Sequence, residues 1–227
     1  MQLTLIHRKP EAHDTVSFIF RPEKPMTWRA GQYLHYALEH PIPDARGVSR
    51  YFSISSAPHE KNVMLTTRFN PRSSSFKNAL ENFEPGSTIQ AEGPEGDFVV
   101  DDSKKKLVFL AGGIGVTPFR SILLDLDHRQ QPIHVQLLFA NRTDDAPFRA
   151  ELDRLALLHR DLRIDYIINP RRLDEAEIRR AVPDLKEPVF YVSGPEPMVE
   201  SFEKMLQAMG IAKDRIKTDF FPGYTWP

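Results

Sequence analysis

The architecture of the second half of the chain follows from one segment, Leu107-Val108-Phe109-Leu110-Ala111-Gly112-Gly113-Ile114-Gly115-Val116-Thr117-Pro118. An apolar run long enough for a buried parallel strand leads into closely spaced glycines, and a Thr-Pro pair that can open a helix follows. Small residues let a pyrophosphate approach the backbone, and the helix start offers unpaired N–H groups and the positive end of its dipole. The segment predicts a strand, a phosphate-binding turn and a helix. Because its spacing differs from Gly-x-Gly-x-x-Gly, a simple tight turn is the alternative.

Beyond this segment, apolar runs alternate with helical patterns. Strand-like runs occupy 107–110, 133–139, 164–168 and 188–192, and helical patterns occupy 118–126, 147–158, 174–181 and 197–209. Such alternation predicts a parallel sheet covered by helices. Ligands bind outside the carboxyl ends of the strands of such sheets, where the glycine turn and Ser193-Gly194-Pro195 both fall.

The first hundred residues have a different sequence pattern, in which strand-like runs predominate. Val16–Phe20 and Val63–Phe69 are strand-like, prolines interrupt the chain repeatedly, and only 74–83 shows helical spacing before Pro85-Gly86 stops it. These features predict a small antiparallel barrel carrying one short helix. The polar run 101–106 marks the boundary, so we expect domains at 1–101 and 102–227.

Composition excludes several classes of function. The 227 residues include 30 basic and 31 acidic side chains, which leaves no overall field to favour nucleic acid or an anionic membrane. With no cysteine there is no disulfide, thiolate iron–sulfur cluster or cysteine nucleophile. The histidines lack ligand spacing, so no metal site is expected. Neither a signal peptide nor a bilayer-spanning stretch is apparent, and a cytoplasmic protein is expected.

The order of several short motifs resembles the ferredoxin–NADP reductase superfamily, nearly from end to end. The matching motifs are Gly31-Gln32-Tyr33, Arg50-Tyr51-Phe52-Ser53, Ser74 with its helix, Gly93-Pro94-Glu95-Gly96-Asp97-Phe98, the glycine turn with Thr117-Pro118, Asn141-Arg142-Thr143 and Ser193-Gly194-Pro195. The resemblance implies an antiparallel Greek-key β-barrel that binds FAD over 1–101. It also implies a Rossmann-like α/β domain that binds NADP or NAD over 102–227.

The family's first flavin element is an Arg-x-Tyr-Ser signature on a barrel strand. The resemblance places Arg50 against the FAD pyrophosphate, where a guanidinium binds phosphate bidentately, with Tyr51, Phe52 and Ser53 near the ring. Phe52 stands where the family usually has tyrosine, so ring stacking is retained and the hydroxyl is lost. The resemblance gives Ser53 a hydrogen bond to flavin N5, hence a catalytic role. A surface arginine beside ordinary strand aromatics is the alternative.

The remaining flavin candidates lie farther along the chain. Ser74 is expected at a helix start that holds a second phosphate, with Ser75 as the alternative register and simple helix capping as the competing interpretation. Thr67, on the strand 63–69, is also a cofactor-binding candidate. Phe220 belongs to an aromatic carboxyl end, Lys217–Pro227, which either shields the flavin or docks on the core.

In the second domain the resemblance lays the nicotinamide nucleotide across the glycine turn. Its candidate contacts are Gly112, Gly113, Gly115, Thr117, Asn141, Arg142, Gly194 and Pro195. Arg142 is a candidate partner for a 2′-phosphate, and Arg171-Arg172 is a second cationic patch, so the choice between NADP and NAD stays open. Ser193, the second catalytic candidate, stands near the nicotinamide where many relatives carry cysteine.

These features favour an FAD-dependent NAD(P)H reductase in which hydride reaches flavin N5 and electrons leave singly for an acceptor on another chain. Ferredoxin, flavodoxin or an oxygenase component is the expected acceptor. A free-flavin reductase is one alternative. A noncatalytic flavin- and nucleotide-binding electron-transfer subunit is the other, motivated by Ser193 and Phe52.

Overall fold

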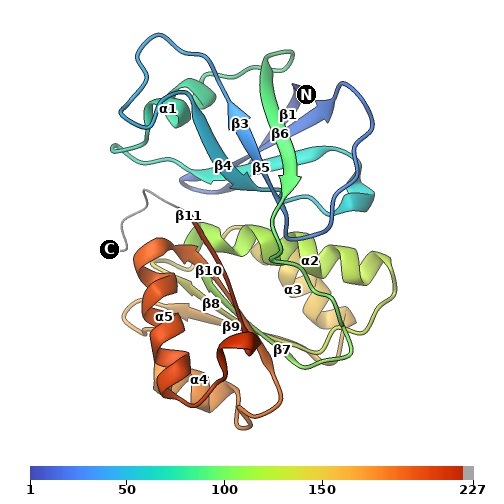
Figure 1. The fold of residues 1–227 in the computed structure, drawn as a ribbon, viewed down its shortest axis with the longest axis vertical. Helices are drawn as coiled ribbons and strands as arrows, with labels where there is room; N and C mark the ends of the chain where they lie inside the picture. The colour runs from blue at the N-terminus through green and yellow to red at the C-terminus, as the bar shows by residue number, and fades with distance from the viewer. Residues whose placement is uncertain (222–227) are drawn as a thin grey trace.

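The computed structural model describes residues 1–221 and contains two sheets stacked end to end (Figure 1). The amino-terminal sheet forms the upper half of the view and the carboxyl-terminal sheet, with its helices, the lower half. The last strand of the chain ends between the two halves. The two-part architecture predicted from the sequence is therefore confirmed.

The amino-terminal sheet is antiparallel, with the strand order β4-β3-β6-β1-β2-β5. Its strands are β1 (Gln2–Ala12), β2 (Thr15–Pro22), β3 (Tyr33–Ala37), β4 (Ser49–Ser53), β5 (Val63–Arg68) and β6 (Thr88–Glu95), with η1 (Pro58–Glu60) before β5 and α1 (Ser75–Glu81) after it. Alternate side chains of these strands point inward. Phe18, Phe20, Leu34, Tyr36 and Leu65 are almost completely buried, and Phe76 of α1 joins them. The barrel with one short helix matches the prediction.

The carboxyl-terminal sheet is parallel, in the order β11-β10-β7-β8-β9. Its strands are β7 (Leu107–Gly112), β8 (Val135–Asn141), β9 (Leu162–Ile168), β10 (Val189–Pro195) and β11 (Ile216–Phe221). The helices are α2 (Thr117–His128), α3 (Arg149–Leu158), α4 (Glu175–Ala181) and α5 (Glu196–Ala208), with η2 (Gly113–Val116) and η3 (Lys213–Arg215) as short turns.

Two apolar clusters cover the two faces of this sheet. Phe119 of α2 and Leu152 of α3 pack with Phe109 on one face, whereas Ile178 of α4 and Phe202 of α5 pack with the β10 side chains on the other. The strand order reverses between β7 and β10, and such a switch point is where open α/β sheets bind ligands. The edge strand β11 was not predicted, because its sequence was interpreted as an aromatic end rather than as a strand.

The two sheets are joined by side chains as well as by the connecting chain. Ser121 of α2 donates to the Ser56 carbonyl oxygen at 2.7 Å, and the Tyr191 hydroxyl donates to the Val99 carbonyl oxygen at 2.9 Å. Gly31 touches the Phe98 backbone with no room for a Cβ atom. Within the described part of the chain, no helix combines the length and apolarity required to cross a bilayer.

Candidate functional site

The glycine turn packs backbone against backbone at the switch point. Gly113 has a φ of 53°, in the left-handed region that favours glycine. A Cβ atom on Gly115 would overlap the carbonyl group of Ser193 and the Cα of Gly194. The carboxyl ends of β7 and β10 are thereby held close together, with an open backbone turn leading into α2.

Two side chains at this edge have unmet hydrogen-bonding capacity. Asn141, at the end of β8, is 9% exposed, and neither atom of its amide has a hydrogen-bond partner within residues 1–221. Ser193 of β10 is fully buried, and its Oγ likewise makes no hydrogen bond to any described residue. Because buried polar groups are normally paired, the Asn141 amide is suited to bind a ligand at this edge.

The other nucleotide candidates lie around the same edge. Gly112 ends β7, and Gly194 and Pro195 end β10. The Thr117 hydroxyl is buried and donates to the Ile114 carbonyl oxygen at 3.1 Å, so the hydrogen atom of that hydroxyl is used within the turn. Arg142 is exposed just beyond β8, whereas Arg171 is paired with Glu177 at 2.9 Å.

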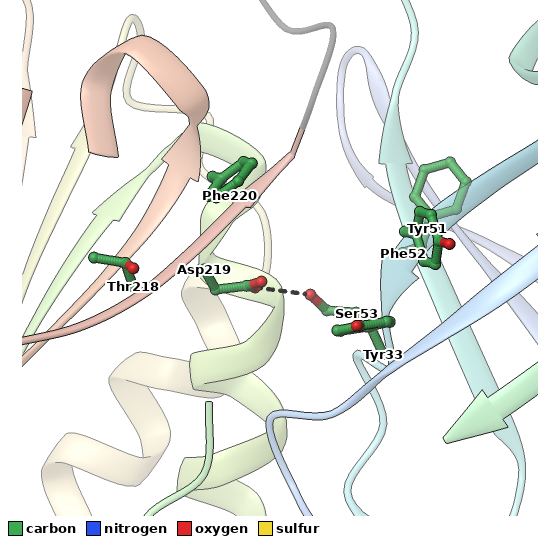
Figure 2. Close-up of a pocket in the computed structure, with 7 residues that line it drawn as sticks. All are labelled: Tyr33, Tyr51, Phe52, Ser53, Thr218, Asp219 and Phe220. Atoms are coloured by element: carbon green, nitrogen blue, oxygen red, sulfur yellow. Dashed lines mark hydrogen bonds between the residues drawn. The ribbon is translucent and has the colours of Figure 1, made fainter. Parts of the chain in front are cut away.

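A cavity of about 300 Å³ lies between the two sheets, bounded by β3 and β4 on one side and β11 on the other (Figure 2). The residues that line it are Tyr33, Tyr51, Phe52, Ser53, Thr218, Asp219 and Phe220. Phe220 is 49% exposed and Tyr51 is 52% exposed. Aromatic rings on both walls of a cavity suit a flat heteroaromatic ligand.

The two aromatic residues of β4, Tyr51 and Phe52, point in opposite directions. Phe52 is buried against Tyr36 and Phe76, with ring centroids 5.9 Å and 5.7 Å away. Tyr51 instead points outward and stacks on His35 at a centroid distance of 4.4 Å. Phe52 therefore forms the floor of the cavity next to the barrel core, and Tyr51 forms its more exposed rim.

The two predicted catalytic serines meet at a carboxylate that the sequence interpretation missed. Asp219 lies opposite Ser193 in the β10–β11 pairing, and Ser53 of the barrel donates to Asp219 Oδ2 at 3.3 Å (Figure 2). Burial raises the pKa of Asp219 to about 7, against smaller opposing effects of the Ser53 and Ser193 hydroxyls. Of these two hydroxyls, that of Ser53 has hydrogen-bonding geometry toward the carboxylate and that of Ser193 does not. A carboxyl group that exchanges its proton near neutral pH thus faces the cavity.

The predicted phosphate-binding residues also meet at an unpredicted aspartate. Arg50 Nη2 donates to both carboxylate oxygens of Asp44, at 2.6 Å and 2.7 Å. The Ser75 backbone N–H donates to the same carboxylate at 3.1 Å. Ser74 caps α1 by accepting the Lys77 N–H at 3.4 Å, which fits both the phosphate-binding and the simple capping interpretations. Arg50 and Ser75 therefore converge on one anion, which in this structure belongs to the protein.

Thr67 and Arg68 differ in their relation to the site. Thr67, the cofactor-binding candidate on β5, is fully buried opposite Val16 of β2. Arg68, which sequence reasoning missed, is fixed by Asp14 at 3.1 Å, and its Nη1 lies 3.5 Å from where a Gly113 Cβ would be. A barrel cation thus reaches the glycine turn of the other sheet.

Of the three missed residues, Asp219 alone carried a signal in the sequence. Asp219 precedes an aromatic pair in a segment already expected near the flavin, so a carboxylate there was discoverable. Asp44 and Arg68 carried no local motif, and only the folded chain brings them to Arg50 and to the glycine turn.

Both expected cofactors fit the residues present. For FAD, the aromatic cavity is joined through Phe52 and Phe76 to the buried guanidinium of Arg50, whose Nε has no partner in the described chain. For a nicotinamide nucleotide, the unpaired Asn141 amide and the side-chain-free backbone at Gly115 provide donors and space. The aromatic carboxyl end beyond Phe221 lies outside the described residues.

Comparisons with known proteins agree with this geometry. The model of the oxidoreductase FAD-binding domain matches residues 2–100, and that of the oxidoreductase NAD-binding domain matches residues 109–204. In fold, the chain is similar to the crystal structure of an Amycolatopsis cytochrome P450 reductase, with a TM-score of 0.82 and 22% identity. That match covers 97% of this chain and 70% of the other.

Curated relatives are longer than this chain. It is 25% identical to a flavohemoprotein of Burkholderia sp. strain TH2, a match that covers 93% of this chain and 56% of the relative. It is 29% identical to an NADPH oxidoreductase of Mycobacterium tuberculosis, with 93% and 57% covered. Over 78% of its length it is 31% identical to the phenoxybenzoate dioxygenase subunit beta of Ectopseudomonas oleovorans, and it spans 54% of that protein.

Proposed function

We propose that this chain, an oxidoreductase with an FAD-binding domain and an NAD-binding domain, transfers electrons from NADPH through FAD to a one-electron redox protein. The observation that carries the proposal is the cavity between the sheets, where Ser53 and Asp219 meet beside aromatic walls, with Ser193 next to Asp219 on the neighbouring strand. When bound, FAD accepts hydride from the nicotinamide and releases electrons one at a time.

The chain's own side chains supply positioning and proton handling. In this proposal Ser53 Oγ lines the cavity and donates to Asp219 Oδ2, and the carboxyl group of Asp219 holds or releases the proton. Ser193 lines the nicotinamide side with an unpaired hydroxyl. Phe220 covers the exposed face of the cavity and must yield when a nicotinamide ring approaches.

The nucleotide preference in this proposal is for NADPH. Arg142 is an exposed cation immediately after β8, the strand whose carboxyl end carries the unpaired Asn141 amide. A guanidinium there suits a 2′-phosphate, and one relative is named an NADPH oxidoreductase. We expect Arg142→Ala to raise the Michaelis constant for NADPH by about tenfold or more while that for NADH changes little. Steady-state kinetics with both nucleotides measure the difference, and equal changes would remove the assignment.

The proposed acceptor is a redox protein of the kind that serves an oxygenase. The support is the relative named as a dioxygenase subunit. Ferredoxin and flavodoxin remain within the same proposal, since both accept single electrons.

An anaerobic titration tests the proposed function directly. The purified protein is loaded with FAD and titrated with NADPH and then, in a second sample, with NADH while the visible flavin band is recorded. Bleaching at low NADPH concentration is expected. A flavin band that neither nucleotide bleaches would favour the noncatalytic electron-transfer subunit instead.

A free-flavin reductase is the second candidate, and the Arg50–Asp44 contact favours it. If the residue expected to hold the FAD pyrophosphate is already paired within the protein, flavin is retained less firmly. Steady-state turnover with FMN or riboflavin as the substrate, compared with turnover of protein-bound FAD, distinguishes the two.

A further inference from the structure

The segment between β3 and β4 places the carboxylate of Asp44 against the guanidinium of Arg50. Asp44 accepts the Arg46 N–H at 2.9 Å as well as the Ser75 N–H and the Arg50 guanidinium, and its own N–H donates to Ser75 Oγ at 2.9 Å. Partial burial pushes the pKa of Asp44 upward, but the hydrogen bonds from Arg46, Arg50 and Ser75 outweigh it and hold the pKa well below its ordinary value. Asp44 is therefore an anion at every physiological pH.

Arg50 retains capacity for another ligand. Its side chain is only 10% exposed, and its Nη1 donates to the carbonyl oxygens of Arg46, Gly47 and Ser49. Its Nε is buried with no hydrogen-bond partner anywhere in residues 1–221. A buried guanidinium normally uses its whole fork of donors, so one position of this site is unfilled.

Two packed aromatic rings link the Arg50 guanidinium to the wall of the cavity. The Arg50 guanidinium carbon lies 5.9 Å from the Phe76 ring centroid, and Phe76 lies 5.7 Å from the ring of Phe52. Phe52 in turn lines the cavity. A ligand with an aromatic ring in the cavity and a phosphate some distance from that ring reaches both places.

The segment carrying Asp44 lies on the surface. Ile42 is 83% exposed, and Glu39, Pro41 and Pro43 are exposed as well. The segment is closed by backbone hydrogen bonds from Leu38 to Val48 and from Gly47 to Asp44, outside the six-stranded sheet. Movement of Asp44 away from Arg50 therefore breaks its hydrogen bonds with Arg46 and Ser75 but no strand pairing of the sheet.

We propose that Asp44 is a specificity-determining residue for the flavin: its carboxylate occupies the place of a flavin phosphate on Arg50 and must be displaced before FAD binds. The inference rests on the proposed flavin site and adds an internal competitor to it. Phosphate-bearing flavins have to displace the carboxylate, whereas riboflavin, which has no phosphate, does not. Asp44 thus weakens FAD binding selectively and leaves the affinity of the cavity for the ring unchanged.

Flavin titrations of the full chain test this competition. Binding of FAD and of riboflavin is followed by fluorescence for the unaltered protein and for Asp44→Asn, which keeps the shape of the side chain and removes its charge. FAD affinity should rise by about tenfold or more, the order expected for release of a charge-assisted contact, and riboflavin affinity should stay constant. Glu39→Gln removes an exposed charge from the same segment and should change neither affinity.

Three results would overturn the inference. FAD affinity that is unchanged in Asp44→Asn would remove the competition. A loss of FAD affinity would show that Asp44 positions Arg50 instead, and an equal gain for riboflavin would show that the cavity, not the phosphate site, had changed. If neither flavin binds either protein, the proposed function fails together with the inference.

A measurement on the unaltered protein covers the case in which the variant does not fold. The ¹⁵N resonance of Arg50 Nε should shift when inorganic pyrophosphate is added, because the anion displaces the carboxylate and reaches the unpaired donor. Sodium chloride at matched ionic strength controls for screening. A resonance that does not respond to pyrophosphate overturns the inference.

Discussion

Asp219 stands out among the side chains because the fold half-buries it at the wall of the cavity, beside the hydroxyls of Ser53 and Ser193. Burial raises its pKa to about 7, whereas the pKa of an aspartate in an unfolded chain is about 4. Between these two values the folded state binds a proton that the unfolded state has released. The free energy of unfolding therefore falls as pH rises through this window, and the loss is complete above the folded pKa.

Asp219→Asn should remove this part of the pH dependence. The amide has nearly the shape of the protonated carboxyl group and does not ionise, so the variant should gain stability relative to the unaltered protein as pH rises from 4 to 8. We expect a gain on the order of 1–3 kcal/mol at pH 8 and little difference at pH 4. Urea unfolding at several pH values measures it.

The exposed variant Asp102→Asn is the matched control and should change stability little at any pH. A constant difference between Asp219→Asn and the unaltered protein across the pH range would contradict the prediction, since it would place the carboxyl group in a solvated environment.

The turn between β7 and α2 depends on a close backbone contact at Gly115, which leaves no room for a side chain. A Cβ atom on Gly115 would meet the backbone of Ser193 and Gly194, whereas one on Gly194 would meet the flexible end of Met198 at 3.0 Å. Gly115→Ala should therefore force the ends of β7 and β10 apart. We expect it to cost on the order of 1–3 kcal/mol of stability and to weaken nicotinamide nucleotide binding, with riboflavin binding retained.

Gly194→Ala serves as the control for Gly115→Ala, because the Met198 side chain can move aside. Thermal unfolding and nucleotide titration should both place Gly194→Ala nearer to the unaltered protein. Equal effects of the two substitutions would show that the turn relaxes freely.

The sequence was sufficient to predict most helices and strands, because each is marked by a pattern within its own residues. The apolar run before Gly112 and the helical spacing of 74–83 are patterns of neighbouring residues, and the structure has β7 and α1 at those places. The edge strand β11 was not predicted, because it pairs with a neighbouring strand on one side only. Its polar and aromatic residues therefore do not form the continuous apolar run of a buried strand.

The candidate site was predictable only in part, for the opposite reason. Arg50, Ser53 and Ser193 belong to recognisable short motifs. Asp44 and Asp219 acquire their importance from partners on other elements, and a carboxylate in a loop or near a chain end looks like any solvated residue until the fold brings a guanidinium or a hydroxyl to it.

An ionic network around a buried arginine bridges the two halves of the molecule. Arg120 of α2 is 4% exposed and donates to Glu60 of the barrel at 2.8 Å and to Glu151 of α3 at 2.6 Å. It also donates to the Ser55 carbonyl oxygen at 2.8 Å, two residues beyond Ser53. Burial pushes the pKa of Glu60 upward, but the hydrogen bond from Arg120 prevails and lowers it, so the network is ionised.

Arg120→Ala should destabilise the docking of the two sheets. The substitution leaves two carboxylates without their cation, and the loss of one partner from a buried pair costs about 3–5 kcal/mol. Arg129→Ala, on the same helix, removes an exposed pair with Asp125 and should cost less than about 1 kcal/mol. Because the cavity is built from both sheets, Arg120→Ala should also slow flavin reduction by NADPH more than it weakens riboflavin binding. Chemical unfolding and stopped-flow absorbance measure the two effects, and equal stability losses in the two variants would contradict a bridging role for Arg120.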